Sequence, residues 1–371
     1  MRFQCEVPEL MSALNTVSRA LAVRSTMPVL EGILLESCAD GLRLMCTDMA
    51  LSIETVIPAT VEEEGRAVMP GRLFLEVIRK LPNDTVSIQI NERHAATIRC
   101  QTSRTTLSGM NPMEFPELPE IEGGAQVSIP QNVLRDMITK TSFAIGTDES
   151  RPILTGALME IEAEEVRLIA LDGFRLAVRR EPLEKLEGGA FSFVAPGNAL
   201  NEVKGICSDV EDLAHVTLGK RHILFEVGDT ELICRRLEGE FLDYKNAIPR
   251  KNPIVIEADT KALIESIDRV SVVISDKLKS PVRCLFDHDK VMLMAKTGNG
   301  EAKDICRVAG DGEGLEIGFN NRYLMEALRF APADTVRIEL NTGVSPAIIV
   351  PTEGEENFLY MVLPVRLKNA D

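Results

Sequence analysis

The chain has 371 residues, a net charge of −16 and 45% apolar residues, which is the composition of a globular protein with about two or three domains. No run of about 18 apolar residues occurs, and the N-terminus has no apolar signal segment. We therefore expect a cytoplasmic protein that neither spans a membrane nor is secreted.

From the N-terminus onward, helices and short strands are predicted in one recurring order, a helix followed by three strands. The helices have apolar residues at helical spacing, as at Leu10, Leu14 and Val17, and the strands alternate, as in residues 336–340. The predicted helices cover residues 9–21, 70–81, 130–144, 196–206, 259–274 and 320–331. The strands predicted in the first third of the chain lie near residues 30–36, 42–47, 51–58, 86–90, 96–100 and 105–108.

The same pattern occurs three times along the chain. Pro28, Pro152 and Pro281 each follow a predicted helix and open a predicted strand, at spacings of 124 and 129 residues. A period of that length corresponds to a whole domain. We expect an α+β fold with three tandem copies of a domain made of helices and an antiparallel sheet. The expected domains cover residues 1–120, 127–248 and 251–371.

A row of sheet-containing domains leaves an unpaired strand edge at each end of the chain. Such edges must be capped, blunted or paired, and neither end of this sequence has an obvious cap. Head-to-tail pairing with a second copy would remove both edges and close a ring.

Three segments carry a resemblance to a known family: residues 171–177, with the sequence LDGFRLA, residues 241–244 and residues 362–367. With the threefold domain plan they resemble the bacterial replicative DNA polymerase sliding clamp, its beta subunit, over the full length. The resemblance implies two chains that close into a ring of sixfold pseudosymmetry, with helices inside and sheets outside. Such a ring encircles duplex DNA without sequence specificity and acts as a processivity factor, with no catalytic chemistry and no cofactor.

The resemblance also implies partners and a location. The implied partners are a second copy of the chain, double-stranded DNA, the DNA polymerase III alpha subunit, the delta subunit of the clamp loader, and other DNA polymerases, ligase and mismatch-repair proteins that bind through short linear peptides. The implied location is the cytoplasm, in association with the nucleoid.

The predicted helices are less acidic than the rest of the chain. They hold eleven Lys and Arg residues against eight Asp and Glu residues, a local balance of +3 within a net charge of −16, which suits loose contact with DNA phosphates. The family implies a DNA-binding set of Arg24, Arg72, Glu149, Arg151, Pro152, Ile153, Lys245 and Arg250. Since an ionised Glu149 cannot donate a hydrogen bond to phosphate, we expect its loop to contribute little.

A partner-peptide groove is implied between the second and third repeats. An apolar groove with arginine at its rim suits an extended peptide with one or two apolar anchors. Phe174 stands where relatives often have histidine, and residues 368–371 form a tail that could shade the groove. The groove set is Leu154, Leu171, Gly173, Phe174, Arg175, Leu176, Leu242, Val344, Pro346, Met361, Leu363, Pro364, Val365 and Arg366.

Ring closure needs complementary surfaces at opposite ends of the chain. An edge strand of the first repeat should meet apolar and charged residues of the third. The expected dimer-interface residues are Arg104, Thr105, Leu107, Val272, Val273 and Glu301.

Enzymatic readings have little support. The sequence has no phosphate-binding G-x-x-x-x-G-K-[ST] loop, no H-E-x-x-H and no G-x-S-x-G, and its cysteines and histidines lack metal-ligand spacing, so no metal site is expected. We interpret residues 310–314 as a turn and residues 287–289 as a hairpin turn. The alternative function is an α+β protein-interaction scaffold that does not encircle DNA, and an unrecognised hydrolase or transferase ranks third.

Overall fold

The computed structural model describes residues 1–119, 121, 123–183, 189–274, 280–352 and 357–367. The tail at residues 368–371, considered above as a possible cover for the groove, lies outside the described residues. The chain forms two compact units. Unit 1 consists of Met1–Arg135 and Ala199–Arg236, and unit 2 of Asp136–Asn198 and Leu237–Asp371.

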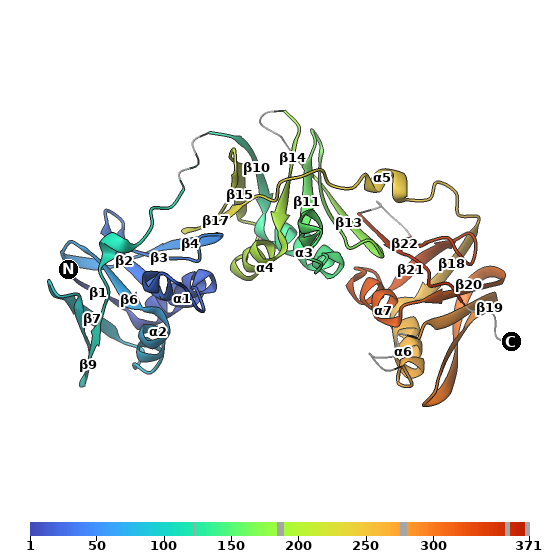
Figure 1. Cartoon of the computed structure of the whole chain (residues 1–371), viewed down its shortest axis with the longest axis horizontal. Helices are drawn as coiled ribbons and strands as arrows, with labels where there is room; N and C mark the ends of the chain where they lie inside the picture. Colours follow the sequence, from blue (N-terminus) through green and yellow to red (C-terminus); the bar gives the residue numbers. More distant parts are fainter. Residues whose placement is uncertain (120, 122, 184–188, 275–279, 353–356, 368–371) are drawn as a thin grey trace. The chain divides into compact units, whose positions relative to one another are not determined.

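Unit 1 contains a five-stranded sheet, an eight-stranded sheet and the helices α1 (Val7–Val17) and α2 (Gly71–Arg79), which pack on each other (Figure 1). The five-stranded sheet has the spatial order β5 (Thr60–Glu63), β1 (Arg2–Glu6), β7 (Thr85–Ile90), β8 (Ala95–Cys100) and β9 (Ser103–Ser108). The eight-stranded sheet has the order β10 (Ala125–Pro130), β15 (Leu213–Leu218), β16 (His222–Val227), β17 (Thr230–Arg235), β4 (Leu51–Ile57), β3 (Gly41–Thr47), β2 (Gly32–Cys38) and β6 (Arg66–Pro70).

Helix α1 shows how the sequence pattern becomes a packed element. Pro8 occupies its first turn, where a missing N–H is tolerated, and Leu10, Leu14 and Val17 line one buried face. That face packs against β3 and β4. After Val17 the chain tightens into a 3-10 turn, Ser18–Ala20, which completes the predicted helical segment.

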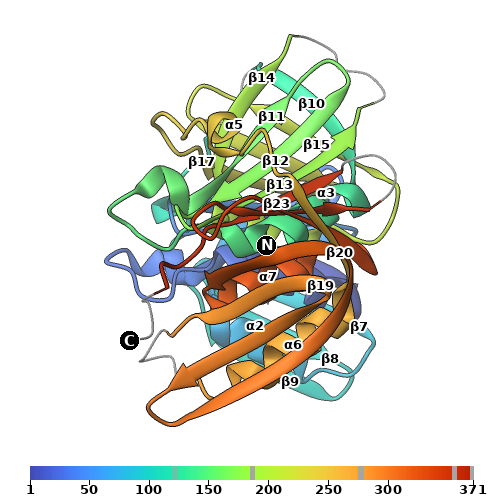
Figure 2. The same cartoon turned by 90° about the vertical axis from the view of Figure 1, so that its right-hand side faces the viewer.

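Unit 2 contains a ten-stranded sheet and the helices α6 (Thr260–Ser271) and α7 (Asn321–Phe330), whose first turns are capped by Asp259 and Asn320. Figure 2 shows the long hairpin that β19 and β20 form in this sheet. The sheet has the order β14 (Phe191–Pro196), β11 (Gly156–Ile161), β12 (Glu165–Leu171), β13 (Arg175–Pro182), β23 (Phe358–Val362), β22 (Ala347–Pro351), β21 (Thr335–Leu340), β18 (Ile254–Asp259), β20 (Gly300–Phe319) and β19 (Val282–Thr297).

The remaining helical elements are two helices shared between the units and several short turns. Helices α3 (Gln131–Thr141) and α4 (Gly197–Ile206) each divide their residues between the two units, and α5 (Tyr244–Ala247) is one short turn in the linker before β18. The 3-10 turns η2 (Pro28–Glu31) and η5 (Pro152–Thr155) contain two of the repeated prolines. All strand pairs among the described residues are antiparallel, which confirms the predicted α+β class.

The predicted order of elements omitted one strand from most half-repeats. β1, β6, β10, β14 and β18 each lie directly before a helix. In the structure β1, β10 and β18 show the alternation of buried and exposed residues that is typical of a sheet. In β1, for example, Phe3 and Cys5 are buried between exposed or half-buried neighbours. Each is five or six residues long and enters its helix without a turn residue, so helical periodicity obscured it.

Two predicted turns were wrong. Residues 287–289 lie inside β19, where the register with β20 shifts on both sides of His288, and Asp289 adopts a positive φ of 50°. Residues 310–314 lie inside β20, with positive φ at Gly310, Glu313 and Gly314. Polar and glycine residues in these segments reflect bulges in one long hairpin, since bulges, like turns, favour such residues.

The cysteines are free thiols, and all except Cys38 are buried. Burial raises the pKa of Cys207 to about 11, so this thiol stays protonated and unreactive at neutral pH. Among the described residues, no helix combines the length and apolar character needed to cross a membrane.

Candidate functional site

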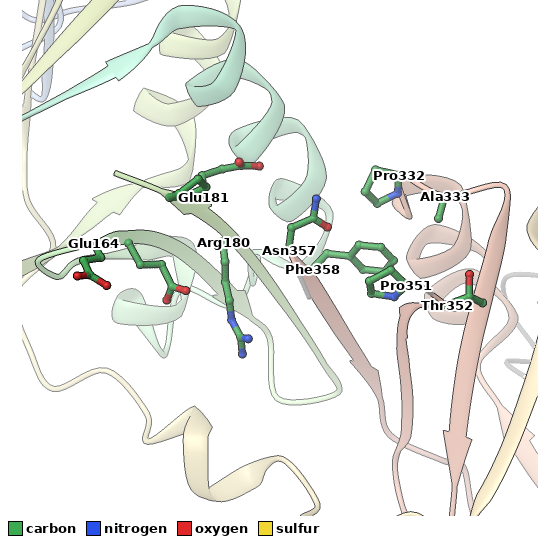
Figure 3. Close-up of a pocket in the computed structure, with 11 residues that line it drawn as sticks. Glu164, Arg180, Glu181, Pro332, Ala333, Pro351, Thr352, Asn357 and Phe358 are labelled. Carbon is green, nitrogen blue, oxygen red and sulfur yellow. The ribbon is translucent and has the colours of Figure 1, made fainter. Parts of the chain in front are cut away.

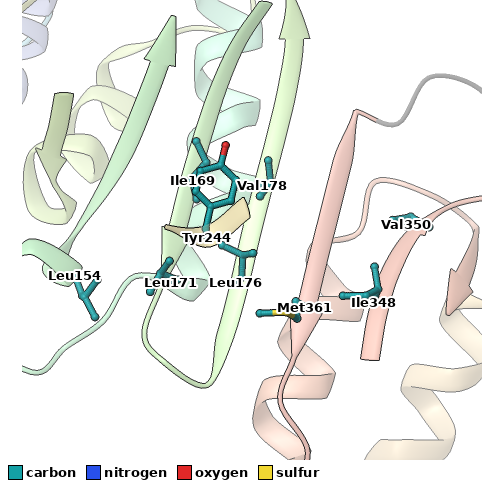
Figure 4. Close-up of a cluster of buried hydrophobic side chains, with 9 residues drawn as sticks. All are labelled: Leu154, Ile169, Leu171, Leu176, Val178, Tyr244, Ile348, Val350 and Met361. Carbon is teal, nitrogen blue, oxygen red and sulfur yellow. The ribbon is translucent and has the colours of Figure 1, made fainter. Parts of the chain in front are cut away.

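A cluster of buried apolar side chains in unit 2 brings together four of the residues expected in the groove. Leu154 comes from η5, Leu171 and Leu176 from the facing ends of β12 and β13, and Met361 from β23 (Figure 4). Met361 pairs directly with Leu176 across the β13–β23 contact. Residues far apart in the sequence thus pack into one buried apolar cluster.

The cluster also contains residues that the sequence interpretation missed. Tyr244 packs into it from α5, and Ile348 joins from β22. The Tyr244 hydroxyl donates a hydrogen bond of 2.7 Å to the Glu160 carboxylate, which also lies 3.4 Å from the Lys245 ammonium. Burial and this carboxylate raise the pKa of Tyr244. These contacts fix the linker against the sheet. In the sequence, the one signal for this packing was the presence of an aromatic residue, Tyr244, in so short a linker.

A tight turn between β12 and β13 forms what we take as the rim of the predicted groove. The Asp172 carboxylate accepts hydrogen bonds from the backbone N–H groups of Phe174 and Arg175, at 2.8 and 3.1 Å. Gly173 has a φ of 91°, a conformation that favours glycine. Phe174 is 55% exposed and stacks on Tyr323 of α7, with ring centroids 6.0 Å apart. The turn therefore presents an aromatic surface to solvent.

Arg175 is buried beneath this rim and fully engaged. Its guanidinium lies 3.0 Å from the Asp172 carboxylate, 4.5 Å from the centre of the Tyr323 ring, and in contact with Glu326. Burial opposes ionisation of Glu326, but hydrogen bonds from arginines, Arg175 first, hold its pKa below the usual range. Arg175 thus fixes the rim against α7 and is less available to a ligand than its sequence position suggested.

The last described residues run along the same rim. The Leu363 N–H donates to the Phe174 carbonyl at 2.8 Å, and the Val365 N–H donates to the Gly318 carbonyl at 2.7 Å. Leu242 and Val344 are exposed, Pro346 and Pro364 are half-buried, and Arg366 is exposed. Exposed apolar side chains beside a buried apolar cluster suit an apolar peptide.

A separate cavity of about 840 Å³ lies at the other end of β13 (Figure 3). Arg180, Glu181, Phe358 and Pro332 are among its lining residues, so its walls mix both charges with apolar groups. None of the predicted site residues lines it.

The predicted DNA-binding residues fall into two groups. Arg24 and Arg72 are exposed in unit 1, and Arg250, Glu149 and Pro152 are exposed in unit 2. Three further residues of unit 2, Arg151, Ile153 and Lys245, lie beside the Asp172–Gly173 turn or the buried cluster. Arg151 lies against Gly173: a Cβ atom built on this glycine would be 3.0 Å from a guanidinium nitrogen of Arg151. Ile153 packs against the buried cluster, and the Lys245 ammonium faces the Glu160 carboxylate.

Several helical arginines are neutralised by neighbouring carboxylates. Arg19 contacts Glu202 at 2.8 Å, Arg79 contacts Glu76 at 3.3 Å, and Arg269 contacts Asp304 at 2.7 Å. Arg72 forms no ion pair with any residue that the structure describes. Ion pairing thus lowers the available positive charge of the helices in the part of the chain that the structure describes.

The expected dimer residues lie on free strand edges or exposed positions. Arg104, Thr105 and Leu107 belong to β9, the edge strand of the five-stranded sheet. Val272 follows α6 and is 83% exposed. Val273 lies close to the start of β20, beside Gly300 and its neighbour Glu301. A Cβ atom built on Gly300 would be 3.7 Å from the Cγ1 atom of Val273.

The same strand junction occurs once in each unit. In unit 1, β17 pairs with β4 and aligns Cys234 with Leu51; in unit 2, β23 pairs with β13 and aligns Val362 with Arg175. Residues 300–307 of β20 correspond to β4 and β13, yet among the described residues they pair only with β19. Strand β9 corresponds to β17 and pairs only with β8 in the same part of the chain. Within the described ranges, each chain thus has one strand of each kind that lacks its junction partner.

Three family models match the chain in succession. They describe the DNA polymerase III beta subunit: its N-terminal domain over residues 1–119, its central domain over residues 128–243 and its C-terminal domain over residues 245–366.

Individual proteins match over the full length. The chain is 32% identical to the beta sliding clamp of Synechocystis sp., with 100% of both chains covered. It is 29% identical to the beta sliding clamp of Bacillus subtilis, with 99% of this chain and 100% of the relative covered. The crystal structure of the DNA polymerase sliding clamp from Bacillus subtilis superimposes with a TM-score of 0.94 at 28% identity, covering 99% of this chain and 100% of the other.

Proposed function

The chain belongs to the DNA polymerase III beta subunit family, and from that membership we propose how it works as a clamp. It is a sliding clamp, a processivity factor with no catalytic chemistry of its own. In our proposal two copies join head to tail around duplex DNA and tether the polymerase to it, without reading the sequence.

The observation that carries this proposal is the pair of unpaired strands described above. The β17–β4 and β23–β13 junctions are built alike, and β9 and residues 300–307 are the two halves of a third junction that a single chain cannot complete. A second copy supplies both missing halves. Closed pairing also removes the exposed edges, which otherwise favour aggregation.

The internal junctions also suggest a register for the dimer. The equivalent strand pairs are Thr47 with Ser52, Leu171 with Leu176 and Lys296 with Glu301, and the two members of each pair are five positions apart. Ser52, Leu176 and Glu301 are therefore equivalent positions. The residues before them, Leu51, Arg175 and Gly300, are equivalent as well. The last pairs of two equivalent hairpins are Cys100 with Ser103 and Val227 with Thr230, so Ser103 and Thr230 are equivalent. Four residues further along each strand, Leu107 is the counterpart of Cys234.

In this register Leu107 of one copy would face Gly300 of the other and pack on Val273. Thr105 would face Ala302, and Arg104 would face Lys303 with Glu301 as its diagonal neighbour. The Arg104–Lys303 juxtaposition is unfavourable and would weaken the interface.

For DNA we propose contact through Arg24, Arg72 and Arg250, with smaller roles for Glu149, Arg151, Pro152, Ile153 and Lys245. Arg24, Arg72 and Arg250 are exposed and form no ion pair with the described residues, whereas Arg151 pairs with Asp148, Lys245 with Glu160, and Ile153 packs on the buried cluster. Few free charges would hold phosphates weakly enough to permit sliding.

For protein partners we propose the unit 2 groove, from Leu154 to Arg366, as the site for their short peptides. Its apolar cluster and exposed Phe174, Leu242 and Val344 support this role. The proposed partners are the polymerase alpha subunit, the delta subunit of the loader, other polymerases, ligase and mismatch-repair proteins. We further propose domains at 1–120, 127–248 and 251–371, and a cytoplasmic location with the nucleoid.

Retention on DNA circles tests encirclement. The protein is loaded on nicked circular plasmid with a clamp loader and ATP, isolated by gel filtration, and the plasmid is then cut once. We expect co-elution with the circle and release on cutting. Failure to co-elute with the circle, or retention on the linear product, would contradict encirclement and favour the scaffold alternative or plain phosphate binding.

A further inference from the structure

The β17–β4 junction of unit 1 reproduces the backbone of the β23–β13 junction of unit 2, where we propose the peptide groove. Asp48 caps the turn between β3 and β4 as Asp172 does between β12 and β13, since its carboxylate accepts from the N–H groups two and three residues ahead, at 2.9 and 2.8 Å. Met49 has a φ of 77° where Gly173 has 91°. Met49 is 64% exposed and adopts a conformation that is costly for a non-glycine residue. The rim of the groove is therefore present twice.

The side chains within the two junctions differ in one consistent way. Glu54 occupies the position of Val178, as the pairs Thr47 with Ser52 and Leu171 with Leu176 establish. By the same alignment Glu231 stands for Leu359 and Glu226 for Val350. Apolar groove positions in unit 2 are carboxylates in unit 1.

These carboxylates lie in register on three neighbouring strands. Glu226 pairs with Glu231 across β16–β17, and Glu231 pairs with Glu54 across β17–β4. Like charges directly opposite each other destabilise a sheet. The nearby positive group is Arg43, 3.7 Å from Glu54 and also 3.6 Å from Glu36, whereas Glu231 forms no ion pair with the described residues. The row keeps an unbalanced negative charge.

A cavity of about 350 Å³ lies against this row. Glu54 and Glu231 line one part of it, and Leu118, Pro119, Leu224 and Ile233 are among its apolar walls. Burial is the main reason that the pKa values of Glu54 and Glu231 are raised, and neighbouring carboxylates add to the effect. An apolar channel beside half-buried carboxylates matches a long aliphatic chain that ends in a positive charge.

We propose that this cavity binds a lysine side chain presented by a partner protein, as a second docking site in addition to the unit 2 groove. The alkyl stem packs on Leu118, Leu224 and Ile233, and the ammonium contacts Glu54 and Glu231. Charge complementarity selects this occupant, because Glu54 and Glu231 stand where the unit 2 junction has the apolar residues Val178 and Leu359.

The test is a titration of the full chain, with its Leu, Ile and Val methyl groups isotopically labelled, followed by NMR. The probe is N-acetyl-lysine N-methylamide, and the matched control probe is the norleucine analogue, which lacks the charge. We expect saturable shifts at the Leu118, Leu224 and Ile233 methyl groups with the lysine probe. Binding of the norleucine probe should be at least about tenfold weaker, as for loss of a charged hydrogen bond.

Variants separate this site from others. E54Q and E231Q should each weaken lysine binding severalfold, while E92Q, at an exposed position between β7 and β8 of unit 1, should not. Melting curves will verify that all three variants fold. Equal shifts with both probes, shifts confined to Leu154 and Leu176, or no saturable shift would overturn the proposal. Tighter binding of free 1,5-diaminopentane than of the lysine probe would also overturn it, since the site would then belong to a small amine.

Discussion

The β23–β13 and β17–β4 junctions use one backbone for two surfaces. Both have an Asp-capped turn, a preceding 3-10 turn and a linker that crosses the sheet, but one encloses Val178, Leu359 and Tyr244 where the other has Glu54, Glu231 and Leu118. The comparison teaches that the repeated fold determines where a binding surface can lie, and that a few outward-facing strand positions determine which ligands it accepts.

The largest expected effect on stability comes from exchanging the apolar residue and the carboxylate at equivalent positions of the two junctions. V178E introduces a carboxylate at a fully buried position between Ile169 and Leu359, so the free energy of unfolding should fall by about 3 kcal/mol. Its counterpart E54V should leave the stability unchanged or raise it. Urea unfolding of both variants measures this, and an equal loss in the two would mean that the junctions do not differ in burial.

The proposed third junction, between two copies, is tested at Val272. V272D should weaken the dimer at least about tenfold, because it replaces an apolar contact of about 1.5 kcal/mol or more by a charge. Since Val272 is exposed within one chain, the monomer should stay folded. Sedimentation measures the dimer, with V210D, at another exposed valine, as the control. An unchanged dimer would exclude Val272 from the interface.

The linker at the unit 2 groove is tested with Y244F. Loss of the hydrogen bond to Glu160 should lower the unfolding free energy by about 1.5 kcal/mol, and affinity for the polymerase alpha subunit, measured by surface plasmon resonance, should fall severalfold. Y360F loses a comparable bond to the Phe330 carbonyl outside the groove cluster. If both variants lose the same affinity, Tyr244 has no special role in the groove.

A smaller effect tests the dimer register. K303E should place a carboxylate opposite Arg104 and strengthen each of the two junctions of the dimer by about 1 kcal/mol, the upper range for a cross-strand pair. K290E, on the neighbouring strand β19, is the control. A weaker K303E dimer would show that the strands pair in another register.

The smallest effect concerns the acidic row. The pKa of Glu231 is raised above its unfolded value, mainly by burial and then by Glu226, against the opposing effect of Arg43. The favourable contribution of its protonated form is present at low pH and lost as pH rises through the folded pKa. E231Q should therefore raise stability by about 0.5 kcal/mol at pH 7, and the gain should shrink toward pH 4. A gain that grows on acidification would have the wrong sign.

The fold was largely predictable because it rests on local periodicity. The spacing of Leu10, Leu14 and Val17 marks α1, and the repeated prolines mark the 3-10 turns before β2 and β11. The site was predictable only where a family motif exists, as at residues 171–177. Alternation shows that Glu54 and Glu231 point outward from their strands, but their proximity depends on a pairing between β4 and β17 that no local pattern contains.

In the proposed dimer, pairing of β9 with residues 300–307 of the second copy also has a kinetic consequence. A dimer joined through two identical junctions separates only when both are open at once. While one holds, the other recloses within the same particle, at an effective concentration in about the millimolar range. Such an assembly can admit DNA by opening one junction without losing its partner, so modest strength at each junction is compatible with a long residence time on DNA.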